Sequence, residues 1–146
     1  DRVIIMGHGE IAQIGRPQEI FRAPRNRFVA EFVGRNNILS GNVAAGQISI
    51  ADRLFPLPGV ADGAAEIVVA ADRMTVSAEA PEGASLAAEF VSEEFAGTGI
   101  ICYFEGPGGE ELKAQVTEDT LATLAPEPGQ TFWLSWAADA PHVMTI

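Results

Sequence analysis

Few residues in this sequence have the types and spacing that catalysis or metal binding requires. A phosphate-binding Gly-x-x-x-x-Gly-Lys-Ser/Thr loop needs a lysine that reaches the β- and γ-phosphates. The single lysine, Lys113, follows Leu112, so this loop is absent. Gly-x-Gly-x-x-Gly and Gly-x-Ser-x-Gly motifs are missing as well. The two histidines, His8 and His142, lie far apart without cysteine or carboxylate neighbours at ligand spacing, so we predict no metal site and interpret both as loop residues.

The cysteine and the paired acids are also better explained by structure than by chemistry. Cys102 lies within the apolar run 100–104, which favours a packed structural thiol and excludes an internal disulfide. Glu93-Glu94 and Glu110-Glu111 could be imagined as acid/base pairs, but adjacent residues of a strand point to opposite faces. We therefore predict solvated strand edges there and no catalytic residue in this chain.

One short polar run could hold a ligand. Arg35, Asn36 and Asn37 carry side chains that can hydrogen-bond an anion. The alternative is that the two asparagines cap a turn between domains. Both readings stay open at this point.

The charge distribution divides the chain near Gly34-Arg35. Residues 1–35, the N-terminal segment, carry a net charge of +2, and residues 36–146, the β-module, carry −13, which gives −11 for the 146-residue chain. A module with three basic residues repels phosphate backbones, so we predict no nucleic-acid partner. The sequence does not begin with Met, and we expect it to be part of a longer protein.

The elements that position these residues can be predicted from turn signals and apolar runs. In the N-terminal segment, runs at 3–6 and 11–14 around two glycines predict a β-hairpin. Two short helices follow, one starting at Pro17 and one capped by Asn26 and ended by Gly34. Arg16 supplies no side-chain cap.

The residue pattern of the β-module is typical of an all-β domain. Short β-type runs recur about every ten residues between Gly, Pro and Asp, which favours a small barrel or sandwich. A short helix is predicted at 117–124, and the segments 37–43 and 85–91 open alike, which hints at two related halves. Trp133 and Trp136 should face opposite sides, one in the core and one at a rim. The predicted strands are 38–43, 47–50, 53–57, 66–70, 74–77, 86–95, 98–104, 111–116, 131–136 and 143–146.

The first 34 residues resemble the end of the nucleotide-binding domain of ABC importer ATPases, with the spacing intact. The residues that carry the resemblance are Asp1-Arg2-Val3-Ile4-Ile5-Met6, Gly9, Ile11, Gln13, Gly15, Pro17, Glu19-Ile20-Phe21, Pro24 and Arg27-Phe28-Val29-Ala30-Glu31-Phe32-Val33-Gly34. The continuation, with Asn37-Ile38-Leu39-Ser40-Gly41, is similar to the polyamine, ferric-iron and sugar uptake branch. In that branch the stretch precedes a transport-associated OB-like module, called TOBE.

The resemblance implies a fold and a function. The fold would be mainly β: an OB-like small β-barrel of the TOBE type at 36–146, preceded by a hairpin and two short helices at 1–35. By this resemblance the chain is the C-terminal regulatory and dimerisation part of an importer ATP-binding subunit, bound at the cytoplasmic face of the membrane. Its partners would be a second copy of the subunit and the membrane subunits.

ATP and Mg would be cofactors of the parent protein and not of this part. Only Asp72 remains of the Arg-Pro-Glu that family members usually carry. The alternative function is sensing of an oxyanion or a polyamine through Arg35, Asn36 and Asn37, and the charge of −13 favours a cation.

Overall fold

The computed structural model describes residues 2–33, 35–97 and 99–144. The predicted hairpin is confirmed: strands β1 (Val3–Gly7) and β2 (Glu10–Gly15) pair antiparallel. His8 and Gly9 both have positive φ in the two-residue turn, which is the conformation that matches the twist of a hairpin. His8 is therefore an exposed turn residue, as predicted.

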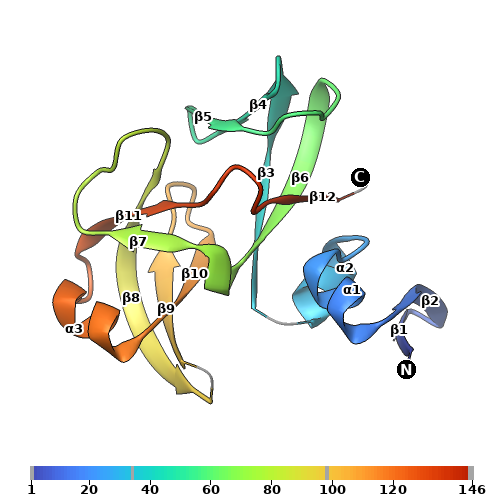
Figure 1. Cartoon of the computed structure of the whole chain (residues 1–146), viewed down its shortest axis with the longest axis horizontal. Coiled ribbons are helices and arrows are strands. Elements are labelled where there is room, and N and C mark those ends of the chain that lie inside the picture. The colour runs from blue at the N-terminus through green and yellow to red at the C-terminus, as the bar shows by residue number, and fades with distance from the viewer. Residues whose placement is uncertain (1, 34, 98, 145–146) are drawn as a thin grey trace.

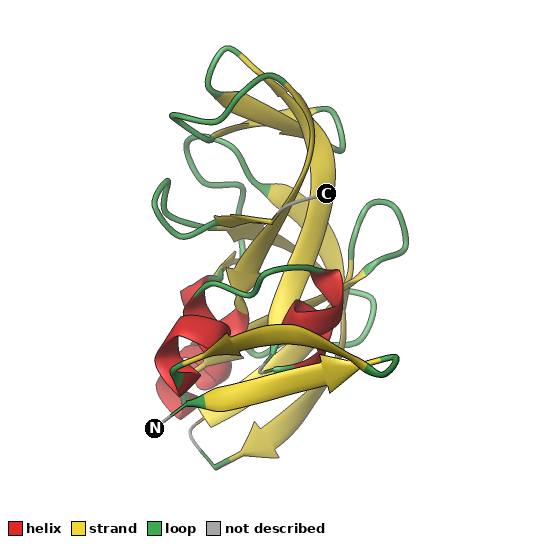
Figure 2. Ribbon diagram, turned by 90° about the vertical axis from the view of Figure 1, so that its right-hand side faces the viewer, coloured by secondary structure: helices red, strands yellow, loops and turns green. Residues whose placement is uncertain are grey.

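Two short helices follow the hairpin, also as predicted. Helix α1 (Pro17–Arg22) starts with Pro and has no side-chain cap from Arg16, whereas the Asn26 side chain accepts a hydrogen bond from the Val29 N–H and caps helix α2 (Arg27–Phe32). Figure 2 shows the hairpin lying across the two helices. Gly34, the predicted end of the second helix, lies outside the described residues.

The β-module consists of two five-stranded antiparallel sheets, here called sheet 1 and sheet 2 (Figure 1). Sheet 1 has the order β12-β6-β3-β4-β5, and sheet 2 has the order β10-β9-β8-β11-β7. The strands of sheet 1 are β3 (Asn36–Ala44), β4 (Gln47–Ile50), β5 (Arg53–Pro56), β6 (Gly63–Ala70) and β12 (His142–Met144). Those of sheet 2 are β7 (Thr75–Ser77), β8 (Leu86–Ala96), β9 (Gly99–Glu105), β10 (Glu111–Val116) and β11 (Thr131–Ser135).

These strands confirm the predicted all-β module, in which a 3-10 turn η1 (Ala71–Arg73) and helix α3 (Glu118–Leu124) are the additional elements. Thr117 caps α3 by accepting from the Thr120 N–H. Thr98 and residues 145–146, which the predicted strands included, lie outside the described residues. In the described part of the chain the sheets stay open, so the fold is OB-like without closing into one continuous barrel.

The two sheets have the same internal plan. The central strand is β3 in sheet 1 and β8 in sheet 2. These two strands run through the segments 37–43 and 85–91, which are similar in sequence. Each half then sends its last strand to the other sheet, because β7 pairs with β11 and β12 pairs with β6. This reciprocal exchange ties the two halves together by backbone hydrogen bonds.

One hydrophobic core lies between the sheets. Phe90, Phe104 and Phe132 meet edge to face with ring centroids 5.8–6.5 Å apart, the arrangement that aromatic quadrupoles favour. Trp136 stacks on the buried Phe55 at 4.5 Å and packs against this core. Trp133 is half-buried on the face of β11 opposite Phe132 and Leu134. Trp136 follows the end of β11 and is half-buried as well, so the prediction that one of the two tryptophans is a core residue of this strand is wrong.

The N-terminal segment has a small core of its own, formed by Ile5, Ile20, Val29 and Val33. A third cluster joins it to the β-module. Ala30 of α2 packs there against Val68 and Met144 of sheet 1. The two parts of the chain are therefore in apolar contact.

Candidate functional site: the junction of the N-terminal segment and the β-module

Polar contacts surround the apolar cluster at the junction. Arg27 of α2 donates from Nε to Glu66 Oε2 of β6 at 3.1 Å, and its terminal nitrogen contacts the same oxygen. Ser40 donates to that oxygen at 3.3 Å. The hydrogen bond to Glu66 raises the pKa of Arg27, so the guanidinium stays charged. Because the Glu66 side chain is only 21% exposed, this ion pair is better shielded from solvent than the other pairs at the junction.

Two further residues hold the end of the N-terminal segment. The Asn36 side chain donates to the carbonyl oxygens of Ala30 and Val33, at 3.0 and 2.9 Å, and so satisfies carbonyls that the end of α2 leaves open. His142 Nε2 lies 3.1 Å from the carbonyl oxygen of Pro24. The prediction that His142 is a loop residue is wrong: it is the first residue of β12, half-buried by this contact.

Asn37 is buried, with 1% of its surface exposed, and connects the two sheets. Its Nδ2 donates to the carbonyls of Val69 and Lys113, at 3.1 and 2.8 Å, and its Oδ1 accepts from the Lys113 N–H at 2.6 Å. The carboxamide thus pairs with both backbone groups of one β10 residue, as a neighbouring strand would. Asn37 therefore covers part of the edge of sheet 2.

A cleft of about 630 Å³ opens between α1 and η1. Arg22 and Asp72 form an ion pair of 3.4 Å across it. Arg35 binds Glu94 at 3.2 Å, and the Tyr103 hydroxyl donates to the same carboxylate. The lining residues are Pro17, Gln18, Phe21, Arg22, Arg35, Asn36, Ala70, Ala71, Asp72 and Gln115.

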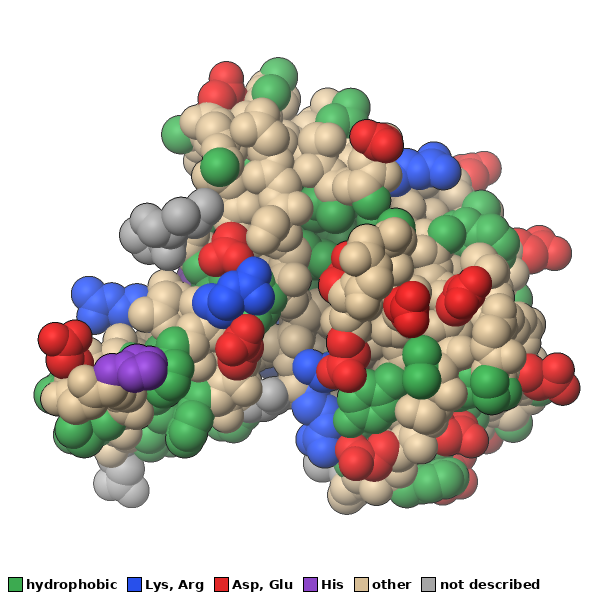
Figure 3. Space-filling model, turned by 180° about the vertical axis from the view of Figure 1, so that it is seen from behind, with side chains coloured by type: hydrophobic (Ala, Val, Ile, Leu, Met, Phe, Trp, Pro, Cys, Tyr) green, Lys and Arg blue, Asp and Glu red, His purple; other side chains and the backbone are tan. Residues whose placement is uncertain are grey.

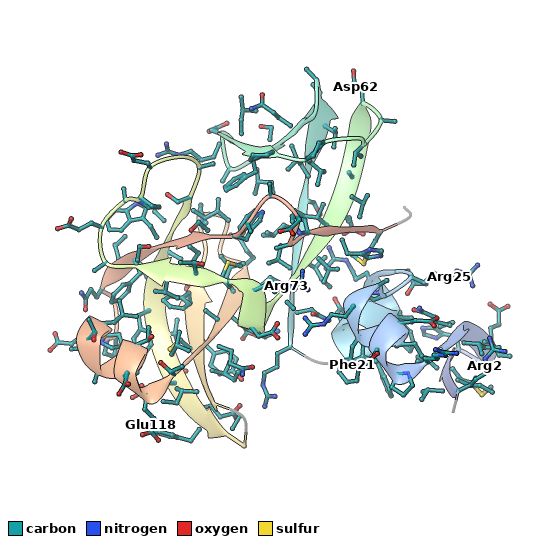
Figure 4. All side chains as sticks on the ribbon, in the orientation of Figure 1. Arg2, Phe21, Arg25, Asp62, Arg73 and Glu118 are labelled. Atoms are coloured by element: carbon teal, nitrogen blue, oxygen red, sulfur yellow. The ribbon has the colours of Figure 1, made fainter. Side chains whose placement is uncertain are left out.

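A second cleft of about 200 Å³ continues the first toward β12 and shares Phe21, Arg22, Asn36 and Ala70 with it. Phe21 and Arg73 line it from opposite sides, one from α1 and the other from η1 (Figure 4). The junction brings three arginines, at 22, 35 and 73, near Asp72 and Asp139. The charges are close to balanced, so the cleft is neither a basic nor an acidic pocket.

Of the three residues predicted to hold a ligand, Arg35 and Asn36 line the larger cleft, while Asn37 is engaged between the sheets. The sequence reasoning missed Phe21 and Arg22, because their position beside η1 depends on how the N-terminal segment docks. No local pattern marks them.

The chemistry that the described residues can perform is limited. Among them, no group of three or more His, Cys, Asp or Glu side chains has the arrangement of a metal site. Burial, and then the charge of Glu93, raises the pKa of the Cys102 thiol to about 11, so the thiol is unreactive at neutral pH. Glu93 and Glu94 are exposed on β8, as predicted for a solvated edge. In the part of the chain described, no helix is long and apolar enough to cross a membrane.

Known proteins share this architecture. The family described as the TOBE domain matches residues 67–144, more than half of the chain, and the chain belongs to that family. A solved structure of the cytoplasmic molybdate-binding protein ModG superposes with a TM-score of 0.64. The superposition covers 78% of this chain and 99% of that chain at 16% identity, a likeness of fold alone.

The curated relatives are ATP-binding proteins of importers. A spermidine/putrescine import ATP-binding protein PotA from Acidothermus cellulolyticus is 31% identical over 93% of this chain. A sulfate/thiosulfate import ATP-binding protein CysA from Acinetobacter baylyi is 25% identical over 92% of this chain. A PotA from Onion yellows phytoplasma is 56% identical over 41 residues, 28% of this chain and 10% of its own length. The chain spans 39% of the length of the first two relatives.

Proposed function

We propose that this chain is the C-terminal part of the ATP-binding subunit of an ABC-type solute importer. Residues 1–35 would end its nucleotide-binding domain, and residues 36–146 would form its regulatory and dimerisation domain. ATP and Mg would act in the parent protein, and its membrane subunits would hold it at the cytoplasmic face of the membrane. The match to importer ATP-binding proteins over more than nine-tenths of the chain supports this proposal.

The exposed apolar face of the hairpin supports the proposal that a larger domain surrounds it. Ile4 pairs with Ile14 and Met6 with Ile11 on its outer face, and all four are 45–59% exposed. Figure 3 shows apolar side chains gathered on this segment. A strand pair that is apolar on both faces is typical of a sheet covered on both sides. Covering these side chains would add roughly 1 kcal/mol each, about half the value for full burial.

The junction supports a regulatory role. The Arg27–Glu66 pair, the Asn36 cap and the Ala30 cluster all join α2 to sheet 1. Movement of the nucleotide-binding domain would therefore carry the β-module with it and not swing on a loose linker. A β-module that is displaced in step with ATP hydrolysis can hold two subunits together or release them.

A charge-reversal series in the full-length parent protein tests this role. Arg27→Glu places a carboxylate against Glu66 and Glu31 and should lower ATP-driven uptake in proteoliposomes, while the double variant Arg27→Glu/Glu66→Arg should restore it. Arg53→Glu, an exposed position on β5, is the matched control. Uptake that is equal in Arg27→Glu and in the control would refute coupling through the junction.

Dimerisation is tested by light scattering of the parent protein. A −13 charge on each β-module opposes close approach of two copies, and added salt screens this repulsion. We expect association to strengthen between low and physiological ionic strength. A parent protein that stays monomeric over this range, with and without ATP, would exclude the dimerisation role.

Ligand sensing is the second candidate function, and the 630 Å³ cleft with Arg35 and Asn36 in its lining favours it. Asn37 would support these residues from the core. ModG binds molybdate, and the relatives are named for spermidine/putrescine and for sulfate/thiosulfate. Calorimetry with molybdate, sulfate, phosphate and spermidine tests the proposal. Heat that disappears in Arg35→Ala but not in Arg53→Ala supports it, and no heat from any of the four removes it.

A further inference from the structure

The burial pattern of strand β8 changes halfway along its length. From Leu86 to Phe90 buried and exposed residues alternate, as expected for a strand with one face on the core. From 91 to 95 all five residues are exposed. A bulge at Val91, between Phe90 and Ser92, separates the two halves. The second half of β8 is therefore built differently from the first.

The exposed half has a backbone partner on one side only. On one side, 92–96 pair with β9. On the other side, β11 pairs with 86–89, and Phe90 exchanges hydrogen bonds with Gly129 and Gln130. Beyond Phe90, no strand of the described residues continues the pairing along this side. Figure 1 shows this end of β8 running with β9 away from β7 and β11.

One edge of sheet 2, that of β10, is partly covered. At the β10 edge of sheet 2, the Asn37 carboxamide takes both the N–H and the carbonyl of Lys113. The 91–96 edge has no comparable cover among the described side chains, and its two apolar residues point into solvent: Val91 is 50% exposed and Phe95 is 72% exposed. Such an edge is a template for strand addition.

Charge decides which strand this edge can accept. Glu93 and Glu94 are exposed at adjacent positions and point to opposite faces. Glu94 already binds Arg35 and the Tyr103 hydroxyl, so among the described ion pairs the carboxylate left for an added strand is that of Glu93. Two further acids of the same sheet, Glu89 of β8 and Glu105 of β9, pair with each other on the other side of the bulge. A second copy of this chain would bring the same acids against them, and like charges opposite one another are destabilising. The edge therefore rejects its own copy and complements a basic strand.

We propose that the β8 edge from Val91 to Ala96 binds an extended polypeptide segment of another protein, in which Lys or Arg alternates with apolar residues. The partner adds one strand to sheet 2 by main-chain hydrogen bonds. Its basic side chains lie on the face of Glu93, where their aliphatic stems also cover Phe95. Its apolar side chains lie on the opposite face, where Glu94 is already paired with Arg35. This edge touches the junction only through the Arg35–Glu94 ion pair, and the proposal does not depend on the transport role.

The test uses the full chain and a peptide of about eight residues in which Lys and Val alternate, acetylated at its N-terminus and amidated at its C-terminus. This length is enough to span the edge. A second peptide has the same sequence with alternate backbone nitrogens methylated, so its charge is kept and its ladder hydrogen bonds are lost. We expect the methylated peptide to bind about tenfold more weakly or worse, equivalent to about 1.4 kcal/mol. Amide resonances of 91–96 should shift, and their hydrogen exchange should slow, only with the unmodified peptide.

Variants separate edge pairing from attraction to an acidic protein. Glu93→Lys should weaken binding more than Glu82→Lys, which makes the same charge change in the exposed segment before β8. Phe95→Ser should weaken binding more than Leu54→Ser, which removes an exposed apolar residue from β5. Equal affinity for both peptides, or equal losses in each pair of variants, would overturn the proposal, as would the absence of peptide binding at physiological salt.

Discussion

The carboxamide of Asn37 offers the sharpest test of how this fold is held together. Replacing Asn37 by Leu keeps the volume of the side chain but leaves the N–H and the carbonyl of Lys113 without the partner that they have in the native fold. Each backbone group that loses its partner costs about 1–3 kcal/mol, so for the two groups we expect a loss of about 2–6 kcal/mol in the free energy of unfolding. This corresponds to a fall in Tm of roughly 5–20 °C for a domain of this size.

Urea unfolding followed by tryptophan fluorescence measures the change, with Asn42→Leu as the control on the exposed side of the same strand. The control should stay within about 0.5 kcal/mol of the native protein. Asn37→Asp retains an acceptor for the Lys113 N–H but places carboxylate oxygen against two carbonyl oxygens, and should be at least as damaging as Asn37→Leu. If Asn37→Leu costs no more than Asn42→Leu, the assignment of Asn37 as the link between the sheets is wrong.

Three further changes have definite expected outcomes. Gly41→Ala should cost about 1–3 kcal/mol by urea unfolding, because a Cβ at this position of β3 would overlap the backbone of Ser49. Asn26→Ala should cost about 1 kcal/mol and reduce helical circular dichroism, because the cap of α2 is lost. Because folding raises the pKa of Cys102 to about 11, the stability that depends on the neutral thiol is complete below its unfolded pKa and is lost as pH rises toward 11. The difference in unfolding free energy between the native protein and Cys102→Ala should change over that range, and a flat difference would contradict the buried position of the thiol.

At the junction, the sequence indicates which residues are candidates for a site but not which residues they contact. Arg35 and Asn36 could be selected because they are polar and follow the change in charge. Their partners could not, because Glu94 is 59 residues away from Arg35 in the chain. Phe21 and Arg22 line the clefts only because helix α1 docks beside η1. Likewise, the contact of His142 with Pro24 joins residues 118 positions apart, so a histidine that looked like a loop residue is the start of a strand.

The sequence by itself determined the local structure and the family. Turn residues at regular spacing and short apolar runs are local signals, so they are sufficient to place the strands, the hairpin, the cap at Asn26 and the short helix after Thr117. Tertiary structure alone decided the exchange of β7 and β12 between the sheets, the burial of Asn37 against Lys113, and the open edge of β8. Each of these depends on pairing between distant segments, and the alternation of residues along one strand does not specify which strand lies beside it.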